Sequence, residues 1–467
     1  MTQSNHQFDV IVCGGGPSGV AAALAAARRG ARVLLLERYG FCGGMATAAL
    51  VNPWAGHEFT DPTTQRRGSL IGGIFKEIAL ALYVRGGFGS ALSASAFDEE
   101  LLKFVYDQAL TAAGVSIRYH SYLIGAKRQG DRIVSLEVTS KGGREEFTGA
   151  SFIDCSGDAD LAALAGISFS VGRPSDGLTQ AMTVSFRMGN VDKTAMIQTG
   201  VLRNARALVE PYFQRALASG ELHYPYRNFV HFYDYPRPGV LHFNMTRINL
   251  VSGLSAGDLT RAEIEGRRQA YLMGEWLIKA VPYFQKAYVE KVACQVGVRE
   301  TRHIQGIYTM SDEDVTRARK FPDGIVRSAY FIDIHNPIGS QDVHTKPEWR
   351  GAVRPEFSPP PGDYYEVPFR CLITSQCTNL LVACRALAAS HEASAAVRVM
   401  ATMHGIGEAA GIAAAEARQR RVDVTEIPGE WVRSQIAYLN EGPDFGVPWN
   451  PTGAANGLQT AASDRIG

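Results

Sequence analysis

The sequence predicts a mixed α/β fold in which a Rossmann-like dinucleotide-binding domain with a β-meander is interrupted by an α+β domain. Three observations lead to this expectation: a strand, glycine turn and helix pattern at the N-terminus, a second apolar run that ends in an acid, and a long middle segment of different texture. The first two observations form one βαβ unit, the building block of doubly wound sheets. The middle segment separates this unit from a further apolar strand and helix near the C-terminus.

The overall composition excludes several classes of protein. The chain has 467 residues, and 47 Lys and Arg balance 46 Asp and Glu, so no overall field attracts nucleic acid or an anionic membrane surface. No apolar run reaches the ~18 residues of a membrane span, and the start lacks the features of a signal peptide, so we expect a cytoplasmic protein. Seven cysteines without CxxC spacing argue against a disulfide framework and a metal site, and no metal ligands are predicted.

The N-terminal glycine turn lies where a dinucleotide phosphate would bind. The apolar run 8–13 is followed by Gly14, Gly16 and Gly19 in GxGxxG spacing, and then by an alanine-rich helical stretch. The first glycine permits the tight turn, the second lets the backbone approach a pyrophosphate, and the third lets the helix lie close to the strand. The helix N-terminus adds unpaired N–H groups and partial positive charge. Glu37 ends the next apolar run, where it would accept hydrogen bonds from an adenosine ribose.

Features beyond this unit favour FAD over a simple NAD-binding domain. A second glycine doublet, Gly43 and Gly44, is placed for the chain to pass close beside an extended ligand. Turn signals and apolar periodicity then predict the rest of the N-terminal part. The expected elements are helices over 69–84 and 98–113, a strand over 115–119, a β-meander over 122–148, and an apolar strand from 151 that ends in Gly157 and Asp158.

A series of motifs runs through most of the chain in one order. They are VIVCGGGPSG, ERYGFCGGMAT, FIDCSGDADLAALAG, GVRETRHIQGIYTMSDEDV, NLLVACRALAASHEASAAVRVM and HGIGEAAGIAAAEA. In these motifs the chain resembles the FAD-dependent oxidoreductases whose FAD domain has the two-dinucleotide-binding motif, as in glutathione reductase. Within them it is similar to a bacterial, mostly uncharacterised family described only as FAD-dependent oxidoreductase. The resemblance implies the fold and an FAD cofactor, but not a substrate.

The resemblance also implies a set of cofactor-binding residues. Two positions depart from the family pattern: Cys384 replaces a glycine, which puts close backbone approach there in doubt, and Glu408 replaces a glutamine, which would alter flavin electronics if it faced the ring. The glycine turn would meet the pyrophosphate, and the second glycine doublet would lead to the isoalloxazine. The implied residues are Gly14, Gly16, Pro17, Ser18, Gly19, Glu37, Arg38, Gly43, Gly44, Met45, Gly157, Asp158, Arg385, His404 and Gly405.

The last apolar strand and helix also make physical sense by themselves. Residues 379–383 form the strand, and from about Thr402 an alanine-rich helix ends in basic residues, as its dipole prefers. Its N-terminus is free to face the negative charge of a reduced flavin, although a buried packing helix would have the same pattern. His404 would lie near the ring or cap the helix. Cys42 is either a small packed residue or a covalent tether, and we expect non-covalent FAD.

The domain organisation follows from where these motifs stop. The middle segment mixes strand-like runs such as 181–188 and 240–251 with a helical stretch near 260–290 and a loop-rich section over 336–363. Because ligands usually bind in clefts between domains, we expect this segment to form the substrate domain. The expected division is a FAD-binding domain over 1–170 and 371–425, a substrate domain over 171–370, and a C-terminal extension over 426–467 with a helix around Trp431.

Titratable residues in the middle segment and in the flavin motifs supply the catalytic candidates. Oxidation of a C–H bond next to oxygen or nitrogen needs a base, and a carboxylate substrate needs a bidentate arginine. Each candidate has a structural alternative: the arginines could pair with Glu300, Asp312 or Glu313, and the histidines could be satisfied beside loops. The candidates are Arg302, His335, His391 and Arg398, followed by Arg299, His303 and Tyr365.

The motifs narrow the reaction to flavin chemistry without a built-in NAD(P)H domain. The glycines over 405–411 have the wrong spacing for a second fingerprint, and no CxxC pair lies near the flavin motifs, which argues against a disulfide reductase. We expect an oxidoreductase that transfers a hydride between FAD and a small polar substrate, an anionic one included, with a separate electron acceptor or donor. A monooxygenase that uses external NADPH and a non-catalytic redox sensor or assembly factor stay open as alternatives, as does assembly into a homo-oligomer.

Overall fold

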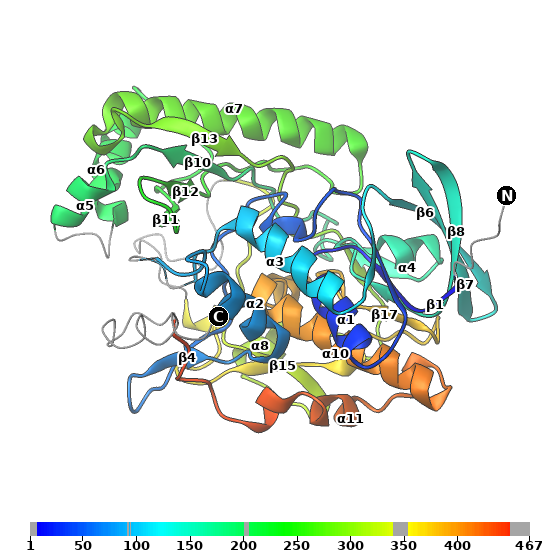
Figure 1. Cartoon of the computed structure of the whole chain (residues 1–467). Helices are drawn as coiled ribbons and strands as arrows, with labels where there is room; N and C mark the ends of the chain where they lie inside the picture. Colours follow the sequence, from blue (N-terminus) through cyan, green and yellow to red (C-terminus); the bar gives the residue numbers. More distant parts are fainter. Residues whose placement is uncertain (1–6, 91–92, 94, 200–204, 340–353, 449–467) are drawn as a thin grey trace, which may run out of the picture.

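The computed structural model describes residues 7–90, 93, 95–199, 205–339 and 354–448. Within them the largest sheet has seven strands, in the order β5-β2-β1-β8-β7-β6 with β17 paired to β8 (Figure 1). This parallel sheet with its meander confirms the predicted mixed α/β, Rossmann-like fold. The strands are β1 (Gln7–Cys13), β2 (Val33–Leu36), β5 (Ser116–Arg118), β6 (Tyr122–Gln129), β7 (Arg132–Ser140), β8 (Gly143–Asp154) and β17 (Leu380–Val382).

Strand β8 belongs to both the meander and the parallel sheet. Its residues 143–148 pair antiparallel with β7, and its residues 148–154 pair parallel with β1. The sequence predicts the end of the meander and the following apolar strand as two elements, whereas the chain runs through both without a turn. Since parallel strands end at one edge of the sheet, the loops after Cys13, Leu36 and Asp154 meet there.

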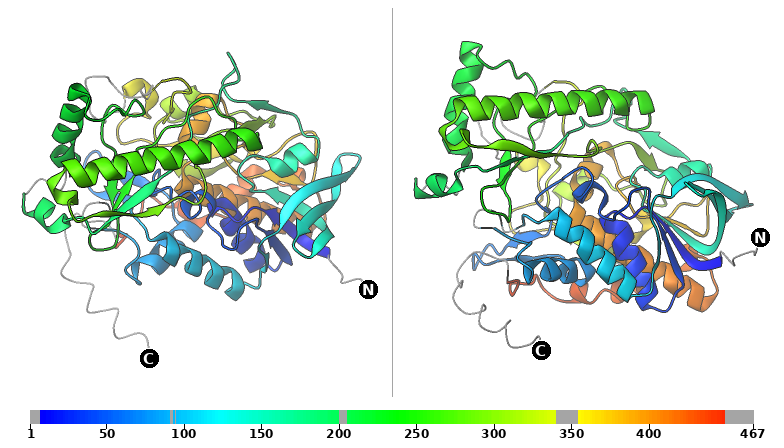
Figure 2. Two further views of the ribbon diagram at one scale, coloured as in Figure 1. Left: turned by 90° about the horizontal axis from the view of Figure 1, so that it is seen from above. Right: turned by 45° about the horizontal axis from the view of Figure 1, so that its top comes forward.

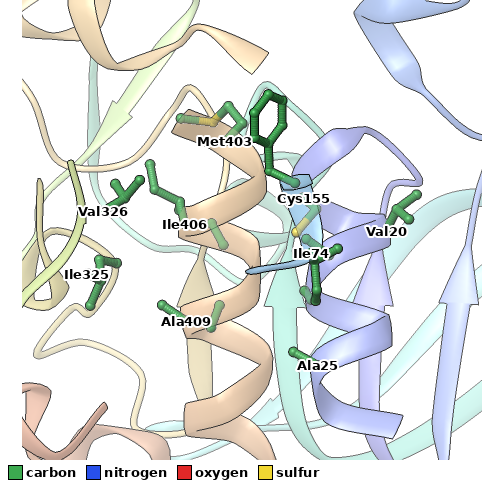
Figure 3. Packing of buried hydrophobic residues seen from close by; sticks show 14 of the residues in the cluster. Val20, Ala25, Ile74, Cys155, Ile325, Val326, Met403, Ile406 and Ala409 are labelled. Atoms are coloured by element: carbon green, nitrogen blue, oxygen red, sulfur yellow. The ribbon is translucent and has the colours of Figure 1, made fainter. Parts of the chain in front are cut away.

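Helices α1 and α10 pack against each other with their backbones in close contact. A Cβ at Gly407 would lie 2.0 Å from the carbonyl oxygen of Ser18, and one at Gly411 would lie 2.2 Å from that of Ala22. Only small residues permit such an approach, which explains the glycine and alanine content of both helices. Figure 3 shows α10 with α1 on one side and β15 on the other. The helices around the sheet are α1 (Pro17–Arg28), α2 (Gly73–Tyr83), α3 (Glu99–Ala112) and α10 (Met400–Arg420).

A second layer lies beside the seven-stranded sheet and its helices and carries a separate core. Its antiparallel sheet has the order β11-β12-β10-β13, and α7 lies along its outer side (Figures 1 and 2). Phe186 and Phe243 stack in this core with their ring centroids 5.0 Å apart, near Trp276 and Leu277 of α7. We call this layer the cap. Its elements are β10 (Phe186–Gly189), α5 (Lys193–Gln198), α6 (Ala205–Ser219), β11 (Phe232–Asp234), β12 (Leu241–Phe243), α7 (Ala256–Ala280) and β13 (Tyr288–Val292).

The middle segment 171–370 contributes residues to several buried cores. Its early part forms the cap, but Ile325, Val326 and Val367 are buried in the same core as α1 and α10. The cap is therefore built from only the early part of this segment, and the later part packs with the helices around the seven-stranded sheet. The remaining elements are β3 (Glu58–Thr60), β4 (Arg67–Ser69), α4 (Asp160–Leu164), β9 (Phe169–Val171), β14 (Arg302–Ile304), α8 (Asp312–Thr316), β15 (Gly324–Ser328), β16 (Tyr365–Pro368), α9 (His391–Val397) and α11 (Gly429–Ser434).

The C-terminal extension is described only in part. Helix α11 contains Trp431, as predicted, whereas residues 449–467 lie outside the described residues, as do 340–353 of the expected loop-rich section. Among the described helices, none combines the length and the apolarity needed to cross a membrane.

A cluster of charges joins the cap to the start of α3. Glu99 and Arg187 form an ion pair with both side chains almost completely buried, and Lys291 and the Tyr235 hydroxyl donate to the same carboxylate at 3.0 and 2.7 Å. Burial alone would raise the pKa of Glu99, but Arg187 and Lys291 outweigh it and lower that pKa to about 2. These buried ion pairs therefore link the cap to α3, and each charge would be costly to bury without its partner.

Candidate active site

A cavity of about 950 Å³ extends from the glycine turn to the cap. One end is built by backbone around Gly14 and Gly16, and the other by side chains that include Arg227, Arg299 and Arg398. We call these the glycine end and the arginine end. The cavity lies at the carboxyl edge of the parallel strands, where open α/β sheets bind their ligands.

The glycine end is fixed by contacts that no larger residue would permit. Gly14 has a φ of +102°, and a Cβ there would lie 2.3 Å from the carbonyl oxygen of Cys155. A Cβ at Gly19 would lie 1.8 Å from the Gly14 oxygen, so Gly19 serves helix packing and lies outside the cavity lining. Gly16 differs, because a Cβ there would meet nothing within 4 Å and would project into open space. It precedes α1 without a side-chain cap, so the first N–H groups of the helix are available to an anion.

Glu37 closes the glycine end at the tip of β2. Its two carboxylate oxygens accept hydrogen bonds from the backbone N–H groups of Gly15 at 2.6 Å and Tyr39 at 2.9 Å. Burial raises its pKa, against the opposing effect of these two hydrogen bonds. Glu37 and the exposed Arg38 both line the cavity. An acid that holds the glycine turn and also faces the cavity suits an adenosine ribose.

Loops that follow β8 and β17 also line the cavity, and the first of them lies beside Gly14. Gly157 and Arg385 line the cavity, whereas the carboxylate of Asp158 is taken up by Arg385 and by the Thr301 hydroxyl, which donates at 2.6 Å. Asp158 therefore orients Arg385 from outside the lining. Cys384, which replaces the glycine of the family pattern, is buried and still belongs to the lining.

Of the second glycine doublet, only Gly44 lines the cavity. Gly44 and Met45 line the cavity, but Gly43 has a φ of +117° and packs against Thr47 outside the lining. Cys42 is fully buried, also outside the lining, and burial raises its pKa despite a hydrogen bond from Tyr119. This placement leaves its thiol without access to a ligand in the cavity.

The last helix meets the cavity with different residues from those expected. It begins at Met400, and Val399, Met400 and Met403 line the cavity. His404 is turned by about 100° from Met403, since a helix has roughly 3.6 residues per turn, and is fully buried. Its Nδ1 lies 2.8 Å from the Met400 oxygen and its Nε2 lies 2.8 Å from the Tyr106 hydroxyl. Burial lowers its pKa to about 4, so it is a neutral core residue, and it lies outside the cavity lining.

Two further positions on this helix also face the core. A Cβ at Gly405 would lie 2.6 Å from a methyl group of Val326, so Gly405 serves packing against β15. Glu408 accepts a hydrogen bond from the N–H of Ile74 at 3.1 Å and lies outside the cavity lining. Burial raises the pKa of Glu408 to about 7.

Three arginines gather at the arginine end. Arg299 follows the cap, Arg398 ends α9, and Arg227 comes from the cap itself. Burial, together with the guanidinium groups of Arg398 and Arg227, lowers the pKa of Arg299 to about 9. Arg299 donates to the carbonyl oxygen of Ala181, which leaves most of its donors directed elsewhere. Like charges brought together at a cavity wall indicate a site for an anion.

Asp333 is the acid that faces these arginines. The Tyr330 hydroxyl donates to its Oδ2 at 3.0 Å, and Arg398 donates to its backbone oxygen at 3.0 Å and lies 3.5 Å from Oδ2. The Nε2 of His335 lies 3.4 Å from Oδ1, and the Nδ1 of His335 is 3.4 Å from a guanidinium nitrogen of Arg247. Because a guanidinium can only donate, Nδ1 accepts and the imidazole carries its proton on Nε2, toward Asp333. His335 thus orients the carboxylate.

Sequence reasoning missed Asp333 and Tyr330. Both belong to the segment YFIDIH, in which the sequence predicts His335 as a candidate base. Had this stretch been treated as extended, Asp333 would have shared a face with His335, since residues two apart lie on one side of a strand.

The other residues predicted as catalytic, among them His391, His303 and Arg302, do not line the cavity. His391 and His303 lie 2.7 and 2.9 Å from one oxygen of the buried Glu300, which corresponds to the structural alternative for these side chains. Burial would raise the pKa of Glu300, but its hydrogen bonds with His303 and His391 prevail and lower it to about 2. Arg302 pairs with Asp160 at 3.0 Å. Of the residues proposed as catalytic from the sequence, the structure brings His335 and Arg398 to the cavity, together with Arg299, and not Arg302, His391, His303 or the buried Tyr365.

Comparisons with known proteins bear on the fold and on the cofactor. The sequence model of a family described as FAD dependent oxidoreductase matches residues 9–436. A soluble pyridine nucleotide transhydrogenase of Serratia proteamaculans (strain 568) is 49% identical over 45 residues. This match covers only 10% of the present chain and 10% of the length of that curated relative.

Solved structures show likenesses of low sequence identity. A geranylgeranyl bacteriochlorophyll reductase-like protein of Thermoplasma acidophilum is 12% identical over 94% of this chain and 93% of its own, with a TM-score of 0.42. The p-nitrophenol 4-monooxygenase of Pseudomonas putida DLL-E4 is 13% identical over 65% of this chain and 70% of its own, with a TM-score of 0.36. At these values the likenesses carry no conclusion about substrate.

Proposed function

The chain belongs to the family of FAD-dependent oxidoreductases, and from this premise we propose that it transfers a hydride between FAD and a small anionic substrate. The observation that carries the proposal is one continuous cavity with the glycine turn at one end and the arginines at the other. A cofactor laid along it from the glycine end would bring its reactive ring toward the arginine end. A separate electron acceptor or donor completes the cycle.

The residues of the glycine end fit the cofactor. Gly14, Gly16, Pro17 and Ser18 present backbone to the pyrophosphate, and Glu37 faces the adenosine side. When bound, FAD accepts or returns two electrons as a hydride. The N-terminus of α10, lined by Met400 and Met403, adds its partial positive charge on the ring side. We assign the binding as non-covalent, because the Cys42 thiol lies outside the cavity lining.

The arginine end supplies the groups that a substrate oxidation requires. Arg299 and Arg398 would hold a carboxylate through charge-assisted hydrogen bonds. The Tyr330 hydroxyl donates to Asp333 and keeps a lone pair that can accept the proton of a substrate hydroxyl or amine, while its own proton passes to Asp333. The Tyr330 and Asp333 pair would therefore take the proton of the substrate, and FAD bound beside it would supply the hydride acceptor. His335 holds that carboxylate in place.

The test starts from the visible absorption spectrum of the purified protein. We expect flavin bands that bleach with anaerobic dithionite and pass to the supernatant after acid precipitation. Hydroxy acids and amino acids are then screened anaerobically for bleaching, and bleaching by at least one carboxylate and not by its amide supports the proposal. Absence of flavin after reconstitution with FAD would overturn it, and yellow colour in the pellet would overturn the non-covalent assignment. Steady NADPH oxidation with peroxide release, in place of bleaching, would identify a monooxygenase instead.

A further inference from the structure

The arginine end is also rich in aromatic side chains, and from this we infer that its ligand is an aromatic monocarboxylate. The inference rests on the proposed function and narrows its substrate class. Five ring-bearing side chains among the described residues line this part of the cavity. They are Phe229, His231 and Tyr233 from the cap, and Tyr330 and Phe331 from the segment after β15.

The rings come from two separate parts of the chain and form two groups. Tyr330 and Phe331 have their centroids 4.6 Å apart with their planes inclined by 32°. On the cap side, His231 contacts Tyr233 edge-on with centroids 4.8 Å apart, and Phe229 meets His231 edge-on at 5.8 Å. The cap group is held in place by a hydrogen bond of 2.9 Å between the Tyr233 hydroxyl and the Nε2 of His231.

Two groups of aromatic rings that line one cavity favour a planar aromatic ligand over a flexible aliphatic one. Aromatic pairs gain about 0.5–1.5 kcal/mol beyond the area that they bury, because the positive edge of one ring meets the negative face of another. A guanidinium can also stack on a ring while its N–H groups bind a carboxylate. Arg299 and Arg398 line the same part of the cavity as Tyr330 and Phe331, so both features act on one ligand.

The position of Asp333 favours a ligand whose single carboxylate is held by the arginines on the side away from this acid. Asp333 lies within 3.5 Å of Arg398 and already places one negative charge among the guanidinium groups. A second carboxylate on the ligand would have to approach this acid, which like-charge repulsion opposes. A hydroxyl or amino group on the carbon next to the ring, the carbon that would also give up the hydride, would instead meet the Tyr330 hydroxyl, which donates to Asp333 at 3.0 Å and keeps a lone pair of its own.

The inference is tested by measuring how tightly small carboxylates bind to the FAD-loaded protein. Binding is detected by the change in the flavin absorption bands and by calorimetry. Benzoate and 4-hydroxybenzoate are titrated against three matched probes: benzamide, which lacks the charge, cyclohexanecarboxylate, which lacks the aromatic ring, and succinate, which has two carboxylates and no ring. We expect both aromatic acids to bind, and each of the three probes to bind roughly tenfold or more weakly. Equal binding of benzamide, cyclohexanecarboxylate or succinate would overturn the inference.

Variants locate the site. Arg299→Gln should weaken benzoate binding by about 10- to 100-fold, because it removes charged hydrogen bonds, while the flavin stays bound. Arg267→Gln, on the exposed face of α7, is the matched control and should bind benzoate as the wild type does. Phe331→Leu should reduce the preference for benzoate over cyclohexanecarboxylate. Benzoate binding unchanged by Arg299→Gln would overturn the inference, whereas a protein that takes up no FAD would contradict the proposed function instead.

Discussion

The two ends of the cavity are built in opposite ways. The glycine end uses backbone from one short stretch, Gly14 to Ser18, which Glu37 at the tip of the next strand holds by a hydrogen bond. The arginine end uses long side chains from Arg227, Arg299 and Arg398, which lie far apart in the sequence. A backbone site needs only a local turn, whereas a side-chain site needs several elements to be correctly packed first.

The two ends also differ in what holds them. At the glycine end, Gly14 lies so close to the Cys155 carbonyl that no side chain would fit between them. At the arginine end, like charges are close together, and Asp333 and the pairing of Glu99 with Arg187 must hold the cap and its residues in place. We therefore expect substitutions at the glycine end to act on folding or on FAD, and substitutions around the arginine end to act on the substrate.

The largest effect should come from Gly14→Ala. The new Cβ would lie 2.3 Å from the Cys155 oxygen at a φ of +102°, so the free energy of unfolding should fall by more than about 3 kcal/mol. Gly16→Ala is its counterpart, because its Cβ meets no protein atom within 4 Å. That variant should unfold in urea as the wild-type apoprotein does, yet bind FAD roughly tenfold or more weakly. If Gly16→Ala bound FAD normally, the pyrophosphate would not lie at this end.

Glu99→Gln should come next in size. It leaves Arg187 buried without its carboxylate, which should cost about 3 kcal/mol of unfolding free energy in urea at pH 7. Glu100→Gln, whose carboxylate is half exposed, is the control and should cost less than about 1 kcal/mol. The pKa of Glu99 is about 2 in the folded protein, below its ordinary value, so its contribution is present above pH 4.5 and is lost as the pH falls toward 2. Equal losses in the two variants would show that the cap is not held by this pair.

Asp333→Asn should affect the reaction and leave the cofactor site intact. We expect FAD binding to stay unchanged and the rate of flavin bleaching by a hydroxyl-bearing substrate to fall roughly 100-fold, since Tyr330 loses the carboxylate that receives its proton. The measurement is stopped-flow absorbance under anaerobic conditions. Asp312→Asn, exposed at the start of α8, should bleach at the wild-type rate. A normal rate for Asp333→Asn would remove the acid from the proton path.

The smallest effect should come from Glu408→Gln, which restores the residue of the family pattern. Burial raises the folded pKa of Glu408 to about 7, above its ordinary value of 4.5, so the folded state holds the proton more tightly and the wild type loses stability as the pH rises through this interval. The variant should therefore be more stable by about 1–3 kcal/mol at pH 8 and equal at pH 4. Its flavin spectrum should match the wild type, and a shifted spectrum would contradict the placement of this side chain away from the ring.

The fold and the cofactor could be predicted because their signals are local. The spacing of Gly14, Gly16 and Gly19 and the acid at Glu37 lie within one βαβ unit, so periodicity and turn chemistry were enough. The last helix forms where the sequence predicts it, and Met400 and Met403 line the cavity, whereas the predicted His404 does not. A shift of one residue turns a helical side chain by about 100°, which moved His404 from the cavity into the core.

The sequence by itself determined the mixed α/β fold and the glycine turn, because each depends on residues that are close in the chain, and the FAD family, because its motifs follow one another in one order along the chain. Only the tertiary structure decided which charged side chains share a cavity. It brought Arg299, Asp333 and Arg398 together and left His391 and Arg302 in structural pairs outside it. Such contacts join residues many positions apart, and the same side chains would serve equally well in a surface ion pair, so no local pattern distinguishes the two uses.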